Sequence, residues 1–212
     1  HDAYKSILEA FIHSGVSNNT KVNVRWVDTE ELEVNDNPDV VFRNIDGILI
    51  PGGFGDRGIE GKIMSSKYAR ENGIPFFGIC LGMQCAVIDF SRHLCNMKAA
   101  NSTEFNRRTK FPVIDLMKAQ KRVVTKGASM RLGSYRCSVI SGTRASSAYR
   151  RKTIDERHRH RYEFNNKYKT KLNNAGLKVS GVNEKLNLVE MIEIPTHPWF
   201  VGVQFHPELK ST

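Results

Sequence analysis

A short apolar segment that passes through a Gly-X-Cys-X-Gly pattern constrains the fold of this chain more than any other feature. Residues 75–79 have the composition of a buried strand, and residues 81–94 have the apolar periodicity of a helix. Between them, the run from Gly78 to Gly82 has the form of a nucleophile elbow, a sharp strand-to-helix turn that exposes its central residue, Cys80, above a sheet. The sequence therefore predicts a sheet in which a strand leads directly into a helix.

Strand and helix signals alternate through the first half of the chain. This order predicts parallel strands covered on both faces, with functional loops at the carboxyl ends of the strands. The expected elements are a helix at 2–14 that starts at Asp2 and stops at Gly15, strands at 21–27 and 45–50, a helix at 59–72 closed by Gly73, a strand at 75–79 and a helix at 81–94.

The second half of the chain carries mostly strand signals. We expect one α/β domain over residues 1–212, with a mostly parallel central sheet, helices on both of its faces and a small antiparallel layer. Residues 101–133 are expected to be the least structured. The other expected elements are strands at 113–117, 130–140, 156–164, 177–183, 188–194 and 199–205 and a helix at 166–174.

Composition excludes several classes of protein. The chain has 212 residues, of which 40% are hydrophobic, and no segment approaches the about 18 apolar residues of a membrane span. Its net charge is +10, but the basic residues are dispersed and match no nucleic-acid-binding motif. The four cysteines form no CxxC pair, so we expect reduced thiols and neither disulfides nor a metal site. A soluble cytoplasmic protein that binds neither membrane nor nucleic acid is expected.

Cys80 is the candidate nucleophile. It is expected at the N-terminus of a helix, where the positive potential favours the thiolate over the thiol. The alternative interpretation is a buried structural cysteine, which is the better interpretation for Cys85 and Cys95, expected within the apolar helix.

A thiol nucleophile needs a base and a group that orients the base. The segment Phe205-His206-Pro207-Glu208 follows an apolar strand, so His206 is the candidate base and Glu208 its orienting acceptor. A glycine-rich loop at 52–55 follows another strand but lacks the Lys and Ser/Thr of a phosphate-binding loop. We interpret it as part of an oxyanion hole formed by the Gly53 and Leu81 N–H groups, with a plain tight turn as the alternative.

These residues resemble a known family, the class I (triad-type) glutamine amidotransferases, and among them the glutaminase domains of the CTP synthase family. The resemblance extends over nearly the whole chain. It is carried by PGGFGDRG (51–58), PFFGICLGMQ (75–84), NSTEF (101–105), MRLG (130–133), ERHRHRYEFN (156–165) and HPWFVGVQFHPE (197–208).

The resemblance implies a reaction and a substrate. Cys80 would attack the side-chain carboxamide of L-glutamine, and ammonia would leave from a γ-glutamyl thioester that water then hydrolyses. Glu104 would bind the α-ammonium group of the substrate and Arg161 its α-carboxylate, with Gln84 and the backbone of Phe54 completing the contacts. Without the resemblance, Glu104 and Arg161 would be interpreted as surface charges.

The resemblance also implies a larger protein. The chain would be a fragment that lacks an N-terminal amidoligase (synthetase) domain and the first strand of the glutaminase domain. This domain itself would need no cofactor, whereas the full-length enzyme would use ATP, UTP, Mg and GTP to form CTP, as a homo-oligomer. Residues 126–133 would be a lid, a GTP-responsive loop or a disordered connection.

Two other functions stay open on the sequence. One is a stand-alone γ-glutamyl hydrolase, which Glu104 and Arg161 disfavour because together they would close the site around a free amino acid. The other is a regulatory or assembly module that is inactive without its partner domain, because catalytic geometry can depend on contacts from outside the chain.

Overall fold

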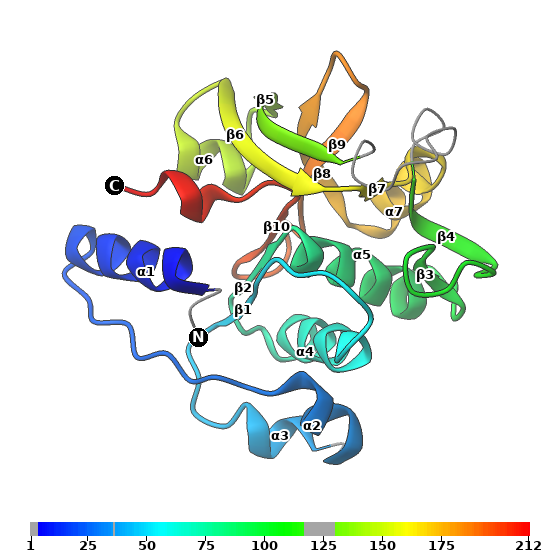
Figure 1. Cartoon of the computed structure of the whole chain (residues 1–212), viewed down its shortest axis with the longest axis horizontal. Coiled ribbons are helices and arrows are strands. Elements are labelled where there is room, and N and C mark those ends of the chain that lie inside the picture. The colour runs from blue at the N-terminus through cyan, green and yellow to red at the C-terminus, as the bar shows by residue number, and fades with distance from the viewer. Residues whose placement is uncertain (1–3, 36, 117–129) are drawn as a thin grey trace.

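The computed structural model describes residues 4–35, 37–116 and 130–212. Its larger sheet has the strand order β1-β2-β10-β9-β8-β5-β6, and a smaller sheet has the order β3-β4-β7 (Figure 1). The strands of the larger sheet are β1 (Ile48–Ile50), β2 (Phe76–Ile79), β5 (Arg131–Val139), β6 (Thr153–His160), β8 (Lys178–Asn183), β9 (Leu188–Glu193) and β10 (Phe200–Val203). Those of the smaller sheet are β3 (Ala100–Ser102), β4 (Phe111–Leu116) and β7 (Tyr162–Phe164).

The α/β class, the central sheet and the small second sheet are confirmed, but the strand directions are more mixed than expected. β1, β2 and β10 run parallel to one another, whereas β9, β8, β5 and β6 each pair antiparallel with their neighbours. In the small sheet, β3 and β4 are parallel and β7 is antiparallel to β4. The connection from β8 to β9 spans only residues 184–187, too short for the crossover that parallel strands require.

Helices cover both faces of the larger sheet. One core cluster joins α4 (Ile59–Asn72), α5 (Leu81–Leu94) and α7 (Lys169–Ala175) to one face, and a second joins α1 (Lys5–Ser17) and α6 (Arg144–Tyr149) to the other. The remaining helical segments are α2 (Thr29–Asn35), α3 (Pro38–Val41), η4 (Asn166–Tyr168) and η5 (Pro207–Lys210).

α5 is the central helix of the molecule. Every residue from Leu81 to Ser91 is buried, because α5 contacts β2 and β10 of the larger sheet as well as β3 and β4 of the smaller one (Figure 1). The two sheets enclose this helix on all sides, including its polar residues Gln84, Asp89 and Ser91. Its N-terminus is thereby fixed between the two sheets, next to the carboxyl ends of β1, β2 and β10.

The predictions for α4 and α5 are confirmed to the residue, and Gly73 ends α4 in a left-handed conformation with φ 65°. Gly15, by contrast, does not stop the first helix, which continues to Ser17. A Cβ at Gly15 would lie 2.5 Å from the Thr20 carbonyl oxygen, so this glycine admits the returning chain instead. The expected cap, Asp2, lies outside the described residues.

The strand expected at 21–27 is wrong. Val22, Val24 and Trp26 alternate with polar residues, but all three are exposed, and the segment is irregular. A strand exists only where a neighbour accepts its backbone hydrogen bonds, and in the described chain no strand pairs with this segment. Alternation alone therefore predicted an extended chain but not its pairing.

The region expected to be least structured, 101–133, is ordered in part. It contains β4 and the end of β3, and it leads into β5 at Arg131. Of the expected lid or GTP-responsive segment at 126–133, residues 126–129 lie outside the described residues. The long strand expected at 156–164 is divided at Arg161 into β6 and β7, which belong to different sheets.

Candidate active site

Cys80 lies between β2 and α5 in a conformation that residues with a side chain rarely adopt. Its φ is 52° and its ψ is −101°, and its N–H donates to the Val203 carbonyl at 2.7 Å. A Cβ on Gly78 would lie 2.6 Å from the backbone of Gly82, and one on Gly82 would lie 2.2 Å from the Ile50 carbonyl oxygen. Both glycines of the elbow are therefore required for the close packing beneath Cys80.

A small cavity of about 100 Å³ opens beside Cys80. Residues from both sheets and from the glycine-rich loop line it, and they include seven of the nine residues expected from the sequence. The lining consists of Gly53, Phe54, Cys80, Leu81, Gln84, Glu104, Met130, His160, Arg161 and Tyr162.

The Cys80 thiol is strongly buried. Burial raises its pKa to about 12, and the hydrogen bond from the Leu81 N–H lowers it by less than burial raises it. The sequence led us to expect that the helix N-terminus lowers the pKa of Cys80 and favours the thiolate. Burial raises that pKa by more, so the thiol is favoured. At neutral pH Cys80 is a thiol, so it requires a base to become a nucleophile.

His206 and Glu208 form a hydrogen-bonded pair near the glycine-rich loop. The His206 Nδ1 lies 2.8 Å from the Glu208 Oε1, and the His206 N–H donates to the Arg157 carbonyl at 2.8 Å. Because a carboxylate oxygen only accepts, the Nδ1–H donates to it, and Nε2 is the ring nitrogen left for proton transfer. Nε2 is buried and has no hydrogen-bond partner among the described residues, so it can accept a proton.

Gly52 packs directly against this imidazole. A Cβ on Gly52 would lie 2.5 Å from the His206 Cε1. The loop was expected to supply backbone N–H groups through Gly53, but the contribution of Gly52 to the position of His206 was not anticipated. It depends on a contact between residues more than 150 positions apart, which no local pattern reveals.

Opposite charges face the cavity at Glu104 and Arg161. Glu104 follows β3, and its N–H donates to the Ser102 Oγ at 3.1 Å. Burial raises the pKa of its carboxyl, while a hydrogen bond from the Gly55 backbone and the charge of Arg161 lower it by smaller amounts. A carboxylate and a guanidinium that line the same small cavity are suited to a zwitterionic ligand.

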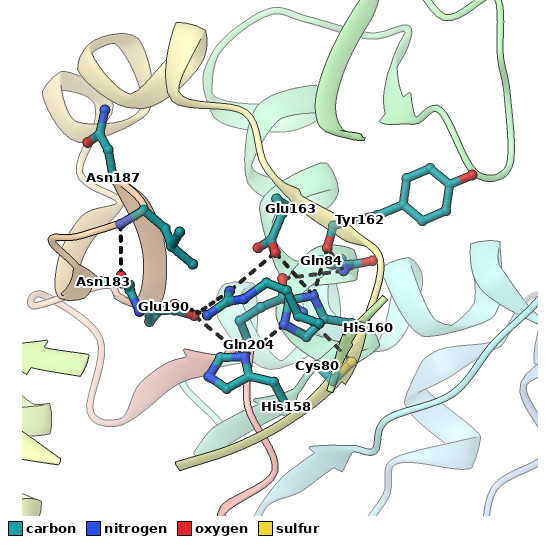
Figure 2. A network of polar contacts seen from close by, with 12 residues as sticks. Cys80, Gln84, His158, His160, Tyr162, Glu163, Asn183, Asn187, Glu190 and Gln204 are labelled. Carbon is teal, nitrogen blue, oxygen red and sulfur yellow. Dashed lines mark hydrogen bonds and ion pairs between the residues drawn. The ribbon is translucent and has the colours of Figure 1, made fainter. Parts of the chain in front are cut away.

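Gln204 is a further buried residue at this site that sequence reasoning missed. Its Nε2 lies 3.7 Å from the Cys80 Sγ, and its Oε1 accepts from Gln84 at 3.3 Å (Figure 2). The available signal was a single polar residue inside the apolar run at 200–205, where it is fully buried. A buried amide must be hydrogen-bonded, so a glutamine in this apolar run, two residues before the candidate base, indicates a hydrogen-bond partner nearby.

Behind the cavity, a buried polar network surrounds Arg131. Its guanidinium contacts Glu163 at 3.2 Å and Glu190 at 2.8 Å. Burial outweighs these contacts and raises the pKa of Glu163 to about 8. Nearby, the His158 Nδ1 lies 2.8 Å from the His160 Nε2 (Figure 2), and burial lowers the pKa of His158 to about 3, so that imidazole is neutral.

Within residues 4–35, 37–116 and 130–212, no group of three or more His, Cys, Asp or Glu side chains could hold a metal ion. No helix in these ranges is long and apolar enough to cross a membrane.

Comparison with known proteins agrees with this arrangement. The family model described as glutamine amidotransferase class-I matches residues 1–212. CTP synthase of Clostridium acetobutylicum is 56% identical over 211 residues, a match that covers 100% of this chain and 39% of the relative. CTP synthase of Chlorobium phaeovibrioides is 58% identical over 212 residues, which cover 99% of this chain and 36% of the relative. The chain thus spans well under half the length of these curated relatives.

A solved structure is similar over most of its length. The glutaminase domain of Trypanosoma brucei CTPS, solved with bound acivicin, superposes with a TM-score of 0.93 and is 38% identical. The match covers 100% of this chain and 83% of that one. This chain therefore belongs to the class I glutamine amidotransferase family and, within it, to the glutaminase domains of CTP synthases.

Proposed function

We propose that this chain hydrolyses L-glutamine to glutamate and ammonia through a thioester on Cys80. The observation that carries the proposal is the cavity beside Cys80, which combines a strained nucleophile elbow with Glu104 and Arg161 as opposite charges. A free amino acid presents an ammonium and a carboxylate to such a pair, and its side chain then extends toward the sulfur.

The first half-reaction forms the thioester. The Nε2 of His206 takes the thiol proton of Cys80, and the sulfur attacks the carboxamide carbon of the substrate. The N–H groups of Gly53 and Leu81 stabilise the resulting oxyanion. The carbon–nitrogen bond then breaks as His206 donates its proton to the leaving nitrogen, which departs as ammonia.

The second half-reaction releases glutamate. His206 takes a proton from water, and the hydroxide attacks the thioester carbon. The carbon–sulfur bond then breaks as His206 donates this proton to the leaving sulfur, which restores the Cys80 thiol and releases glutamate. Glu208 keeps His206 in one tautomer and stabilises the imidazolium that forms in each half-reaction. Gln84 and the backbone of Phe54 complete the contacts with the substrate.

The longer protein is part of the proposal. The chain would form a single glutaminase domain that supplies ammonia to an N-terminal synthetase domain of the same polypeptide. That domain would use ATP and Mg to aminate UTP to CTP, and GTP would stimulate the glutaminase. A cytoplasmic location and a homo-oligomeric assembly of the full-length enzyme stay predictions.

Release of ammonia and glutamate from L-glutamine tests this proposal. The unaltered protein, assayed as this chain and as the longer polypeptide, should turn over glutamine, and Cys80→Ala should abolish turnover without changing the circular dichroism spectrum. Ammonia release by Cys80→Ala at the original rate would contradict the mechanism. Equal turnover of a γ-glutamyl peptide would favour the hydrolase, and activity only in the longer polypeptide would favour a module that depends on its partner.

A further inference from the structure

Gln204 connects the nucleophile to the wall of the cavity. It follows β10, is fully buried, and lies two residues before His206. Its backbone N–H donates to the Glu190 carbonyl at 2.8 Å, and the preceding residue, Val203, accepts from the Cys80 N–H. Hydrogen bonds therefore fix the backbone at Val203 and Gln204, which restricts the position of the Gln204 side chain.

A chain of three contacts determines which end of this carboxamide faces the sulfur. The Tyr162 backbone carbonyl can only accept, so the Gln84 group 3.1 Å from it must be the NH₂. That same NH₂ lies 3.3 Å from Gln204, which must therefore present its oxygen there. The NH₂ of Gln204 is then the end that lies 3.7 Å from the Cys80 Sγ (Figure 2).

We propose that Gln204 is a positioning residue for Cys80. The side-chain NH₂ of Gln204, oriented by Gln84 and Tyr162, donates to the Cys80 sulfur, fixes its position and stabilises the thiolate. The role of this contact in catalysis rests on the proposed function, whereas the contact between Gln204 and Cys80 does not depend on glutamine. When His206 removes the thiol proton, charge develops on a buried sulfur. A donor already in place then stabilises that charge without reorganisation. Gln84, which lines the cavity, becomes coupled to the nucleophile through the same amide.

Burial raises the pKa of the Cys80 thiol, and the hydrogen bond from the Leu81 N–H lowers it by a smaller amount. A second donor to the thiolate, such as the Gln204 NH₂, acts in the same direction as Leu81. Removal of the Gln204 donor should therefore raise the pH at which Cys80 becomes reactive. Loss of a hydrogen bond to the charged sulfur should shift that pH by roughly half a unit or more. Gln204→Met removes the donor and keeps an unbranched side chain of similar length.

The test measures the pH dependence of Cys80 alkylation by iodoacetamide, with the labelled site identified by peptide mass mapping. Below the thiol pKa of about 12, Gln204→Met should reach a given alkylation rate at a pH at least half a unit above that of the unaltered chain. Asn183→Leu is the matched control. The buried Asn183 amide is hydrogen-bonded to the backbone of Arg136 and Leu186, and Asn183 does not line the cavity. An unchanged pH profile of the alkylation rate in folded Gln204→Met would overturn the proposal, as would an equal shift in the control.

A second measurement does not require Gln204 to be replaced. In nuclear magnetic resonance spectra of the Cys80→Ala protein, the side-chain NH₂ resonances of Gln204 should move relative to those of the unaltered protein, because their acceptor is gone. The NH₂ resonances of Asn183 should stay in place. No movement at Gln204 would overturn the proposal even if Gln204→Met failed to fold.

Failure of this inference can be distinguished from failure of the proposed function. Alkylation and amide shifts report on the contact between Gln204 and Cys80 whether or not glutamine is turned over. If the pH profile of alkylation shifts but glutamine is not hydrolysed, the positioning role stands and the assigned reaction fails. In an active enzyme, Gln204→Met should lower kcat more than it raises KM, because the contact stabilises charge that develops during the reaction.

Discussion

At the scale of single residues, Cys80 combines two unfavourable properties. Its backbone has positive φ, which costs about 1–3 kcal/mol for a residue with a side chain, and its thiol is enclosed where ionisation is disfavoured. Both are consistent with a site in which the sulfur must be exposed to a ligand and ionised only when a base acts. Strain of this kind persists because the surrounding structure holds it.

The backbone strain at Cys80 gives a stability prediction. Cys80→Gly should unfold at a higher urea concentration than Cys80→Ala, because glycine adopts this conformation without a steric cost and alanine does not. We expect a difference of roughly 1–2 kcal/mol in the free energy of unfolding. Neither variant should turn over glutamine. Equal stability of the two would mean that the turn stores no strain.

Gly52 gives a second prediction at this scale. Gly52→Ala should lower kcat by roughly ten-fold or more, because the new Cβ would displace the His206 ring and small misplacements of a catalytic base are costly. Gly47→Ala is the control, since a Cβ there would lie 3.4 Å from its nearest neighbour, the Pro75 carbonyl oxygen. Full activity of folded Gly52→Ala would show that the imidazole does not depend on this contact.

The candidate site could be predicted from sequence only in part. Cys80, His206 and Glu208 stand in short local patterns whose chemistry is specific, so the residues alone pointed to them. Glu104 and Arg161 do not stand in such patterns, and a charged residue on a loop or strand is usually solvated. Only the family resemblance indicated these two residues. Gln204 and Gly52 act through contacts with residues distant in sequence, and these follow from the fold.

At the scale of elements, too, features set by local sequence patterns were predicted, whereas those that depend on distant segments were not. α4 and α5 were predicted to the residue because periodicity, glycine stops and the elbow all indicate the same boundaries. The segment at 21–27 was predicted wrongly because pairing depends on a neighbouring strand that sequence alternation does not specify. The mixed directions of the larger sheet likewise arise from the connections between strands, which are less evident than the strands themselves.

The close approach of α5 to β1 gives a prediction for these elements. Gly82→Ala should destabilise the protein by roughly 2–4 kcal/mol, because its Cβ would overlap the Ile50 carbonyl oxygen at 2.2 Å and neither backbone can yield easily. The gain in helix propensity, about 1 kcal/mol, would not compensate. Urea unfolding monitored by circular dichroism measures the change. An unaltered midpoint would show that α5 can shift away from β1 at little cost.

At the scale of the whole molecule, two groups of the buried network, His158 and Glu163, make the free energy of unfolding depend on pH in opposite directions. The folded-state pKa of His158 is lowered to about 3, so acidification below its ordinary value of 6.5 favours the unfolded chain, which binds the proton more readily. The folded-state pKa of Glu163 is raised to about 8 from 4.5. Between those values the folded state binds more protons, so stability falls as pH rises.

The two effects oppose each other between pH 4.5 and 6.5 and act singly outside that range. We therefore expect the free energy of unfolding to fall from pH 6.5 to 8, with a slope of at most about 1.4 kcal/mol per pH unit. Glu163→Gln should remove most of this decline, whereas Glu71→Gln, at a half-exposed position, should not. A slope that is the same in Glu163→Gln would mean that Glu163 is ionised in the folded protein at neutral pH.

The central claim is that Cys80 is a formed nucleophile at the base of a glutamine pocket. The most direct test is the intact mass of the protein after incubation with a chloroketone analogue of glutamine, which alkylates a thiolate with loss of chloride. We predict one adduct, mapped to Cys80 and suppressed by L-glutamine. No adduct, or equal labelling of Cys80, Cys85, Cys95 and Cys137 that glutamine does not suppress, would contradict the claim.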